Sequence, residues 1–570
     1  MKKFTLILLG MILGSTFVMA GGLVHNTNQS AAWSRMLSRG ATLDIDAVYY
    51  NPAGLTKLKD GFHISVSSQS IFQTQTINST FPHLLYGGEF EGKIAAPVFP
   101  SAYFAYKTGK WAFSAAFIAI GGGGGAKFDK GVPMMHIPIA SLVTAFQDFG
   151  VTGYSVDMEF QGRSVYWGLQ VGASYAITEN ISVFAGARYI MAKNSYKGHV
   201  RDIKLQMADG TEQRADDFMN NAAAQTLAGS QQAQQGAELA LTAGNSMTPI
   251  ITGGGGELTW DQAVAMGVLT DQQSVALQTG LINSGFSEAE VAAMNMATAQ
   301  QSYFGTSDYL NNLAGELLVQ AGQLQGGAAL MGDQEGDITQ TGAGITPIIG
   351  ANLSFFDNDL NIGLKYEFET KLELENEVPS FIEDGKTYYK GFIIGMDENG
   401  DPVYMFPDGA KTNADIPAML SVGVDYRIVD PLLISVTYHS YFDKQTQWAK
   451  DDNSIDNNFW ELGLGLQYDI SENFLVSAGF LRANTGVNKA YQSNLSFSLT
   501  SNTIGLGGAY KINDMFKVNF GGYYVMYDKQ TYDYQYEVMG NPPTLVNYQD
   551  SYLKSTFAVA VGLDIAIGKK

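Results

Sequence analysis

Cysteine is absent from all 570 residues of the chain. This absence excludes a disulfide framework, a zinc–thiolate site and a catalytic thiol. Basic residues are also scarce, with 34 lysines and arginines against 55 aspartates and glutamates and a formal net charge of -21. Such a balance repels polyphosphate, and no basic stripe offsets it. Nucleic acid is therefore excluded as a partner.

Long apolar runs are lacking after the first residues. The chain opens with two lysines and an uncharged run that closes on Val18-Met19-Ala20, a pattern typical of a secretory signal peptide. We predict that residues 1–20 are removed and that the mature chain begins near Gly21, with a retained N-terminal anchor as the alternative. No second stretch of about 18 apolar residues follows, the length that a transmembrane helix needs.

Aromatic residues and glycine are abundant instead, with 30 Tyr, 32 Phe and 64 Gly. In an exported chain this composition indicates either a large soluble all-β protein or a membrane β-barrel. Residues 167–177 carry apolar or aromatic side chains at odd positions and small or polar ones at even positions, and residues 461–469 and 557–568 repeat the alternation. We predict strands with one face toward lipid and one toward a lumen, although strands of a soluble sandwich also alternate.

The lengths of the connections separate these two alternatives. Short polar turns are expected near residues 108–110, 178–180, 357–359, 429–430, 471–473 and 513–514. Long connections are expected near residues 73–97, 122–163, 197–340, 373–412, 444–457, 484–498 and 529–552. Such strict alternation is typical of outer-membrane barrels, whose closed sheet leaves no free edge in lipid. The predicted fold class is all-β, a 14-stranded antiparallel transmembrane β-barrel over residues 61–570 with both ends periplasmic.

Residues 21–60 alternate poorly and are rich in turn formers. Within them, Asn51-Pro52-Ala53-Gly54 is a turn signal, because Pro52 fixes one dihedral and Gly54 permits a tight turn. The segment precedes the first strand on the periplasmic side. We therefore predict that it enters the lumen as a hatch, or plug.

The Asn51-Pro52-Ala53 motif after a short N-terminal segment, together with fourteen predicted strands, resembles the FadL/TodX family of outer-membrane transporters for hydrophobic compounds. The resemblance implies that residues 51–54 belong to an N-terminal hatch inside the barrel. It implies a lipophilic pocket in the lumen and a sideways exit into the bilayer where the third strand kinks inward. It also implies that the first residues of the mature chain approach the ligand, namely Gly21, Gly22, Leu23 and Val24.

The third predicted strand, about residues 110–120, runs into five consecutive glycines. A glycine run leaves the backbone free to bend and offers no side chain to block a gap. We interpret it as a candidate kink and gate, with the start of a flexible loop as the alternative. The gate candidates are Gly121, Gly122, Gly123, Gly124 and Gly125.

Candidate ligand-binding residues lie on the nominal inward faces of the third and fifth strands. Arg188 suits the carboxylate of a fatty acid, because arginine pairs with carboxylates bidentately. It could equally belong to a structural charge ladder with Lys365, Glu367 or Asp425. The ligand-binding candidates on these two strands, in addition to Gly21–Val24, are Ile118, Ile120, Phe184, Arg188 and Ile190.

The connection at residues 197–340 is far larger than the family resemblance implies. Its middle is low in charge and rich in Ala and Gln, and three Ser/Thr-x-x-Glu/Gln pairs indicate capping boxes at helix starts. We interpret it as a partly helical extracellular insertion within the barrel domain, with partial disorder as the alternative. The pairs are Thr259 with Gln262, Thr270 with Gln273 and Ser287 with Glu290.

Enzymatic chemistry is not indicated. The six histidines fall in no nucleophile or metal motif, and neither G-x-S-x-G nor H-E-x-x-H occurs. We expect no cofactor and no metal.

The expected function is passive uptake of hydrophobic compounds, such as long-chain fatty acids, across the outer membrane of a Gram-negative bacterium. The expected partners are that hydrophobic small molecule, outer-membrane lipid and lipopolysaccharide, with the protein a monomer. The alternatives are a general porin and a surface adhesin displayed on a barrel.

Overall fold

The structure is a computed structural model of the chain. It describes residues 25, 28–383, 385–397, 400–540 and 542–568, so the predicted signal peptide and Gly21–Val24 lie outside the described residues. The chain divides into two compact units. Among the described residues, those within 1–212, 333–397 and 401–570 form the first unit, a barrel, and those within 213–332 and 398–400 form the second, a helical hairpin.

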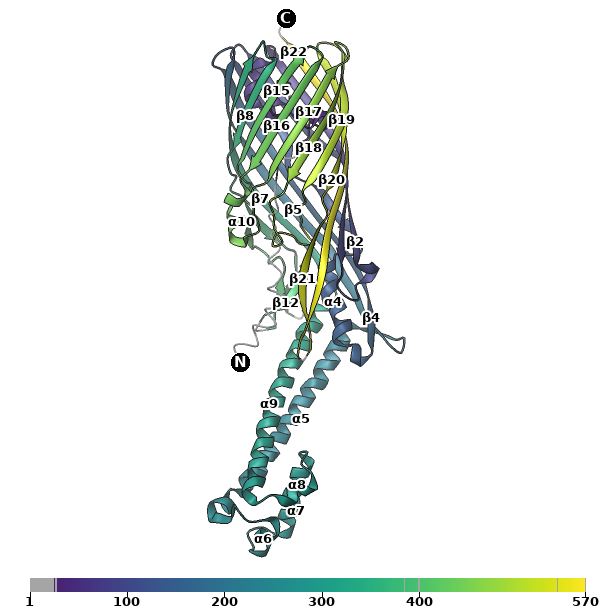
Figure 1. The fold of residues 1–570 in the computed structure, drawn as a ribbon, viewed down its shortest axis with the longest axis vertical. Helices are drawn as coiled ribbons and strands as arrows, with labels where there is room; N and C mark the ends of the chain where they lie inside the picture. Colours follow the sequence, from purple (N-terminus) through teal and green to yellow (C-terminus); the bar gives the residue numbers. More distant parts are fainter. Residues whose placement is uncertain (1–24, 26–27, 384, 398–399, 541, 569–570) are drawn as a thin grey trace. The chain divides into compact units, whose positions relative to one another are not determined.

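The barrel is an antiparallel sheet of 14 strands that closes on itself, which confirms the predicted fold class (Figure 1). Each strand pairs with the next in the order given below, and the last pairs with the first. Closure pairs each strand with two neighbours, as lipid requires of a spanning sheet. The strands are β1 (Gly61–Ser79), β2 (Glu89–Thr108), β3 (Trp111–Phe128), β4 (Val151–Ala176), β5 (Ile181–Met207), β7 (Gln334–Phe355), β8 (Leu360–Glu367), β15 (Met419–Val429), β16 (Leu432–Tyr441), β17 (Trp460–Asp469), β18 (Phe474–Asn484), β19 (Ser501–Lys511), β20 (Phe516–Tyr527) and β22 (Thr544–Gly568).

The strands alternate between an apolar outer face and a small or polar inner face. On β22, Val559 and Val561 point outward and are 43% and 58% exposed, whereas Ala558 and Ala560 between them are buried. Successive side chains of a strand point to opposite faces, so the period of two in the sequence becomes the two faces of the wall.

Several stretches predicted to be long loops are strand instead. Residues 73–97 belong largely to β1 and β2, and β4 and β5 run to 26 and 27 residues. Residues 529–552 form a hairpin of β21 (Gln530–Val538) with the start of β22. In β21, Tyr alternates with Thr, Asp, Gln and Glu, a composition that favours strand without producing an apolar outer face. Hydropathy therefore indicated only the apolar part of each strand.

Short elements fill the ends of the barrel unit. They are η2 (Leu85–Gly88), α4 (Pro133–Ala145), η3 (Gln147–Phe149), β6 (Glu212–Arg214), β9 (Glu373–Glu377), β10 (Ser380–Glu383), β11 (Lys386–Tyr389), β12 (Ile393–Met396), β13 (Pro402–Tyr404), β14 (Lys411–Asn413), η5 (Asp443–Gln445) and α10 (Gln447–Asp452).

Residues 28–57, which we call the plug, lie within the barrel (Figure 1). They contain α2 (Ala31–Met36), α3 (Ala47–Tyr50) and η1 (Pro52–Lys57). The helix α2 begins at Ser30, whose Oγ accepts a hydrogen bond from the Trp33 backbone N–H, and it ends at Leu37 in the left-handed conformation. Nearly all of these residues are buried, so the plug fills the lumen at its level.

The wall meets one side of the plug with glycine. A Cβ atom at Gly423 would overlap the backbone of Gly40, and one at Gly479 would overlap the backbone of Met36. Gly463 approaches the carbonyl oxygen of Leu37 in the same way. Glycine allows this direct contact of backbone with backbone because it has no side chain.

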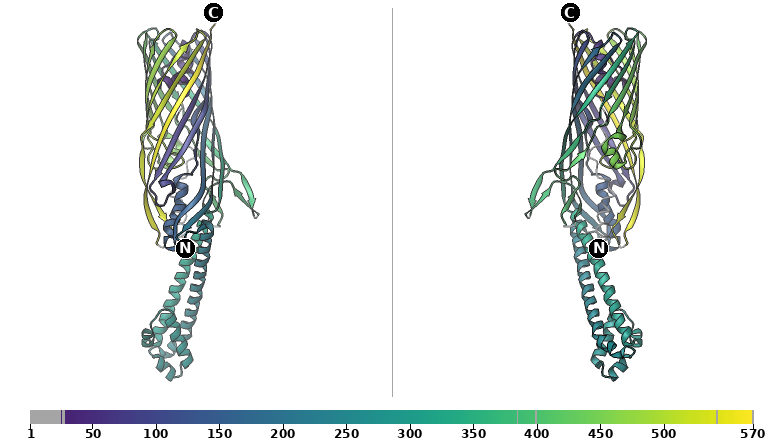
Figure 2. Two further views of the ribbon diagram at one scale, coloured as in Figure 1. Left: turned by 90° about the vertical axis from the view of Figure 1, so that its right-hand side faces the viewer. Right: turned by 90° about the vertical axis from the view of Figure 1, so that its left-hand side faces the viewer.

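The second unit is a helical hairpin with a small tip. Residues 213–332 contain α5 (Ala215–Ile250), the π-helical turn η4 (Ile251–Gly255), α6 (Trp260–Ala265), α7 (Asp271–Asn283), α8 (Glu288–Ala293) and α9 (Met296–Leu330). All three predicted capping boxes are confirmed, at the starts of α6, α7 and α8. Figure 2 shows α5 and α9 side by side, and small residues such as Ala233, Ala237 and Ala314 are buried in this hairpin. None of the helices in the described part of the chain has the length and apolar character that a membrane crossing requires.

Candidate functional site: the lumen and a break in the wall

The Asn51-Pro52-Ala53 motif fastens the plug to three neighbouring strands. The Asn51 side-chain amide donates to the Asn352 side chain on β7 (2.8 Å) and to the Thr42 carbonyl (3.1 Å). Ser174 on β4 and Ser182 on β5 donate to the carbonyl oxygens of residues 52 and 53, at 2.6 and 2.7 Å. The motif thus hydrogen-bonds to the barrel wall through its backbone carbonyl groups and its one amide side chain.

Two residues of this region are packed too closely to admit larger side chains. Ala53 is fully buried against Phe184 and Ile348. A Cβ at Gly54 would lie 2.6 Å from the Asn51 amide nitrogen. Larger side chains at either position would push the turn away from the wall.

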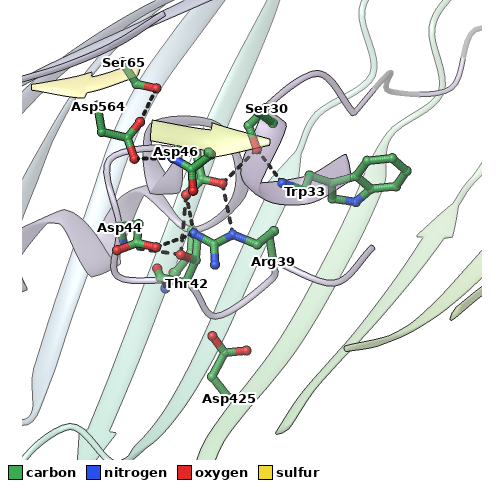
Figure 3. Close-up of polar contacts among 12 residues, drawn as sticks. Ser30, Trp33, Arg39, Thr42, Asp44, Asp46, Ser65, Asp425 and Asp564 are labelled. Atoms are coloured by element: carbon green, nitrogen blue, oxygen red, sulfur yellow. Dashed lines mark hydrogen bonds and ion pairs between the residues drawn. The ribbon is translucent and has the colours of Figure 1, made fainter. Parts of the chain in front are cut away.

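An ion cluster holds the first half of the plug together (Figure 3). The guanidinium of Arg39 donates to both carboxylate oxygens of Asp46, at 3.0 and 2.6 Å, and to Asp44 at 2.8 Å. Asp46 also accepts a hydrogen bond from Ser30 Oγ at 2.9 Å. Because Ser30 also caps α2, the start of the helix and the following loop form one hydrogen-bonded body.

A small cavity with a volume of about 10 Å³ is lined by residues of the barrel strands and of the segments that follow them. Three predicted ligand-binding residues, Ile120, Arg188 and Ile190, line it. A space of this size accommodates at most one water molecule, so a hydrophobic ligand enters only if neighbouring side chains or the plug move. The remaining lining residues are Thr346, Glu367, Phe368, Thr370, Ile416, Pro417, Met419 and Tyr441.

The other two predicted ligand-binding residues are separated by the structure. Ile118 is buried in the apolar cluster that includes Ile120 and Ile190. Phe184 belongs to a different cluster, beneath Ala53. The geometry therefore brings four of the five candidates to one region and assigns Phe184 to the support of the plug.

Arg188 is held by protein partners. It donates to both oxygens of Glu367, at 2.7 and 2.9 Å, and twice to the Gln170 side chain. Lys365 donates to the same carboxylate at 2.8 Å and to the carbonyl oxygen of Tyr49 at 2.8 Å. This is the structural charge ladder that the sequence offered as the alternative role of Arg188, with Lys365 and Glu367 as its members and Asp425 outside it. It joins two cations to one carboxylate, and a second buried carboxylate, Glu461, accepts a hydrogen bond from the cavity-lining Tyr441.

The wall has a break between β2 and β3. Their ladder pairs Ala102 with Phe117 at one end and Lys93 with Lys127 at the other. Within these described strands no ladder pair joins residues 94–101 of β2 to residues 118–126 of β3. We call these two stretches the break. Unpaired backbone in a lipid-facing wall is costly, so the break marks a departure from the regular barrel.

The glycine run forms one edge of the break. It lies inside β3 rather than at the start of a loop, which corrects the alternative drawn from the sequence. The β3–β4 ladder shifts register twice here, between Ala119 and Gly121 and between Gly122 and Gly124. Gly122 has a φ of +75°, and a Cβ atom there would overlap the Ser164 carbonyl oxygen. Only glycine fits this bend without strain.

Two prolines on the opposite edge were missed in the sequence. Pro97 and Pro100 lie in β2 across from the glycine run. Proline has no N–H to donate to a neighbouring strand and is confined to sheet edges or bulges. The proline pair facing a glycine run was therefore the sequence signal for an unpaired stretch.

Aromatic rings line the break. Phe117 stacks on Trp167 of β4, with ring centroids 5.0 Å apart. Phe99 of β2 lies with its ring centroid 6.4 Å from Trp167, although β3 runs between their strands. The Phe99 ring thus reaches across the unpaired stretch and gives it an apolar surface.

Comparison with known proteins bears on the fold. The sequence matches no protein-family model and no curated protein. A FadL homologue from Pseudomonas aeruginosa superposes with a TM-score of 0.53 and 12% identity, covering 96% of this chain and 100% of that chain. The chain has the FadL-type fold. The resemblance inferred from residues 51–53 is confirmed at this level.

Two further solved structures are similar at lower scores. The P. putida toluene transporter TodX has a TM-score of 0.47 and 12% identity over 94% of this chain and 97% of that one. The Ralstonia pickettii toluene transporter TbuX has a TM-score of 0.42 and 14% identity over 94% and 98%. At these TM-scores neither adds weight to the argument.

Within this FadL-type fold, His25 packs against aromatic residues close to the cavity. Its ring stacks on Phe459 with centroids 3.7 Å apart, and its Nε2 lies 3.0 Å from an oxygen of buried Asp443. Tyr441, which lines the cavity, is 4.6 Å from the same ring. His25 was not singled out in the sequence. Among the described residues, no three of His, Asp and Glu gather as a metal site.

Proposed function

We propose that the protein is an outer-membrane channel for passive uptake of hydrophobic compounds. The observation that carries the proposal is the break, an unpaired stretch of wall edged by prolines and glycines. Its aromatic surface and the buried Ile118 and Ile120 give it an apolar character on both sides. A solute leaving the lumen there would enter the bilayer without crossing a polar surface.

The proposed route begins at the cavity beside Arg188 and leads past Ile120 to the break. Ile120 is the link, since it lines the cavity and lies in the stretch of β3 that has no partner on β2. The cavity is too small for a ligand in this state. We therefore propose that the plug gates the route and shifts when a ligand binds.

The proposed ligand is a long-chain fatty acid or a similar amphipathic acid. Support comes from the two cations, Arg188 and Lys365, that share the carboxylate of Glu367 beside the cavity. These two cationic side chains suit one anionic head group, and the neighbouring isoleucines suit its tail. A neutral hydrocarbon would gain nothing from these cations.

We also propose residues 1–20 as a cleaved signal peptide, a location in the outer membrane with both chain ends periplasmic, contacts with lipid and lipopolysaccharide, and a monomer. Residues 21–60 are the proposed hatch, and residues 197–340 the proposed extracellular insertion. A general porin is disfavoured because the plug fills the lumen at its level. An adhesin built on residues 213–332 remains the second candidate, since that segment has an apolar core of its own.

The decisive experiment closes the break. The double variant Pro97→Val, Pro100→Val restores two backbone donors to the break. We expect uptake of a fluorescent fatty acid by cells or proteoliposomes to fall at least tenfold. The control, Pro542→Val with Pro543→Val, removes two exposed prolines from the β21–β22 turn. Unchanged uptake in the Pro97/Pro100 variant, with correct assembly, would refute exit through the break.

A deletion separates the second candidate. Removing residues 215–330 should leave uptake intact if the barrel is the transporter. Loss of surface binding with retained uptake would assign adhesion to the helical hairpin as an additional activity. A steady large conductance of the intact protein in planar bilayers would favour a porin instead.

A further inference from the structure

A large cavity lies beside the hairpin that β21 forms with the start of β22, and its volume is about 1000 Å³. Pockets that hold a ligand of drug size measure about 300–1000 Å³. None of its described lining residues lies in the break or lines the small cavity beside Arg188. The lining includes three successive cross-strand pairs of the hairpin, namely Asp533 with Gln549, Tyr534 with Tyr548 and Gln535 with Asn547.

Two of these pairs present amides that are already fixed in place. Gln535 Nε2 donates to Asn547 Oδ1 at 2.8 Å, and Gln549 Nε2 donates to Asp533 Oδ1 at 2.8 Å. All four side chains are exposed. A carboxamide carries two N–H donors and an acceptor oxygen with two lone pairs, so each amide keeps hydrogen-bonding capacity for a ligand. Because the existing bonds hold the side chains in one conformation, binding costs little further side-chain entropy.

The third pair supplies aromatic carbon surface. Tyr534 and Tyr548 are half-buried and stack with their ring centroids 5.7 Å apart. Lys489, in the loop before β19, places its Nζ 4.6 Å from the centroid of the Tyr534 ring. The cavity thus combines aromatic ring surface with hydrogen-bond donors and acceptors.

This combination selects one class of ligand. A sugar ring has hydroxyl groups that donate and accept hydrogen bonds, and patches of C–H that pack on an aromatic ring. A fatty chain would remove water from the amides and from Asp533 without replacing their hydrogen bonds, which is unfavourable. The hydrophobic solute of the proposed uptake route therefore does not suit this cavity.

We propose that the cavity binds an oligosaccharide. Tyr534 and Tyr548 contact the C–H faces of its sugar rings, and the amides of Gln535, Asn547 and Gln549 bind its hydroxyl groups. The cavity lies at the loop end of β22, which faces outward if both chain ends are periplasmic as proposed above. The saccharide chain of lipopolysaccharide and a free oligosaccharide carry the same chemistry, and the experiment separates these two sources.

The test measures the binding of two fluorescein-labelled probes by fluorescence anisotropy, with the full chain in phosphatidylcholine nanodiscs. The probes are maltohexaose and the core oligosaccharide released from purified lipopolysaccharide. The double variant Gln535→Ala, Asn547→Ala removes one amide pair, and Ala490→Trp places an indole in the cavity from an exposed lining position. The matched control is Thr531→Ala with Ser551→Ala, which removes an exposed hydrogen-bonded pair (2.8 Å) of the same hairpin outside the cavity lining.

We expect at least one probe to bind the parent protein saturably, with an affinity that falls at least tenfold in both cavity variants and stays at the parental value in the control. A tenfold loss is the size expected when about two hydrogen bonds are removed. Heat-modifiable migration on gels shows that each barrel has folded. Absence of saturable binding for both probes, or parental affinity in either folded cavity variant, would overturn the proposal. If the amide variant does not fold, Ala490→Trp alone decides.

Competition then identifies the source of the saccharide. If the core of neighbouring lipopolysaccharide occupies the cavity, the probe binds at least tenfold more weakly in nanodiscs with complete-core lipopolysaccharide than in nanodiscs with lipopolysaccharide that lacks these sugars. Equal affinities assign the cavity to a free oligosaccharide. Neither measurement depends on the uptake of a hydrophobic compound, so a failed saccharide site and a failed uptake route give different results.

Discussion

Substituting Glu367 by Gln tests the charge ladder most directly. Glu367 and Arg188 are almost fully buried, and three charge-assisted bonds of 2.7, 2.9 and 2.8 Å converge on the carboxylate from Arg188 and Lys365. Removing one partner of a buried ion pair costs about 3–5 kcal/mol, because the other charge is left unpaired. The amide oxygen of Gln still accepts one of the three bonds. We therefore expect a loss of about 3 kcal/mol in the free energy of unfolding.

The measurement is equilibrium unfolding in urea with the protein in lipid vesicles, followed by tryptophan fluorescence. The matched control is Glu373→Gln, which breaks an exposed pair with Lys411. Exposed pairs contribute little, so we expect no measurable change. Equal effects of the two substitutions, or no effect at Glu367, would refute the claim that the ladder is a buried, stabilising pair.

The same variant distinguishes ligand classes. Replacing Glu367 by Gln leaves two cations without a carboxylate beside the cavity. A fatty acid should therefore bind more tightly to the variant, relative to a fatty alcohol of the same length, than to the parent protein. If acid and alcohol shift by the same factor, the charge beside the cavity does not read the head group, and the proposed preference for an acid is wrong.

Three further changes probe other parts of the structure. Ala53→Leu adds volume where Phe184 and Ile348 already pack, which typically costs about 1–3 kcal/mol; limited proteolysis should show a loosened plug in an intact barrel. Gly122→Ala forces a side chain into a position with φ +75° and should lower assembly yield, whereas Gly109→Ala in an open turn should affect it less. Burial lowers the pKa of His136 in α4 to about 4 from about 6.5. As pH falls, His136 in the unfolded loop binds a proton before His136 in the folded loop does. The folded α4 should therefore be most stable above pH 6.5 and lose stability toward pH 4. Hydrogen exchange in α4, corrected for intrinsic rates, should accordingly be faster at pH 5 than at pH 7.

The sequence predicted the barrel because its strands need one apolar face. That requirement gives a period of two, readable in residues 167–177 and 557–568. Outside these apolar bands, residues 530–538 of β21 alternate Tyr with Thr, Asp, Gln and Glu. The hydropathy of such a segment does not distinguish it from a loop, and for this reason the predicted strands are shorter than the observed ones.

The candidate site was predicted in part. The glycine run at 121–125 indicated a bend, but the break became evident only with its partner, the Pro97–Pro100 stretch of β2. The pairing of Arg188 with Glu367 was one of several possibilities. It depends on the registers of β5 with β7 and of β7 with β8, and strand register over such distances is not written in any local pattern.

The two sides of the plug differ in how they are held, and this decides which part can move. Between Met36 and Gly40 the plug backbone touches wall glycines directly, and close-packed atoms of this kind leave no room for a sliding motion. At Gln29 the plug contacts the break through hydrogen bonds with Ala119 and Ser101, each worth about 0.5–1.5 kcal/mol net. A ligand displaces this end only to the extent that it binds the displaced plug more tightly than the resting one, and these hydrogen bonds oppose that displacement less than the packed glycine contacts do. If the plug gates the route as proposed, we therefore expect its N-terminal end to move while the part that rests on the glycines stays in place.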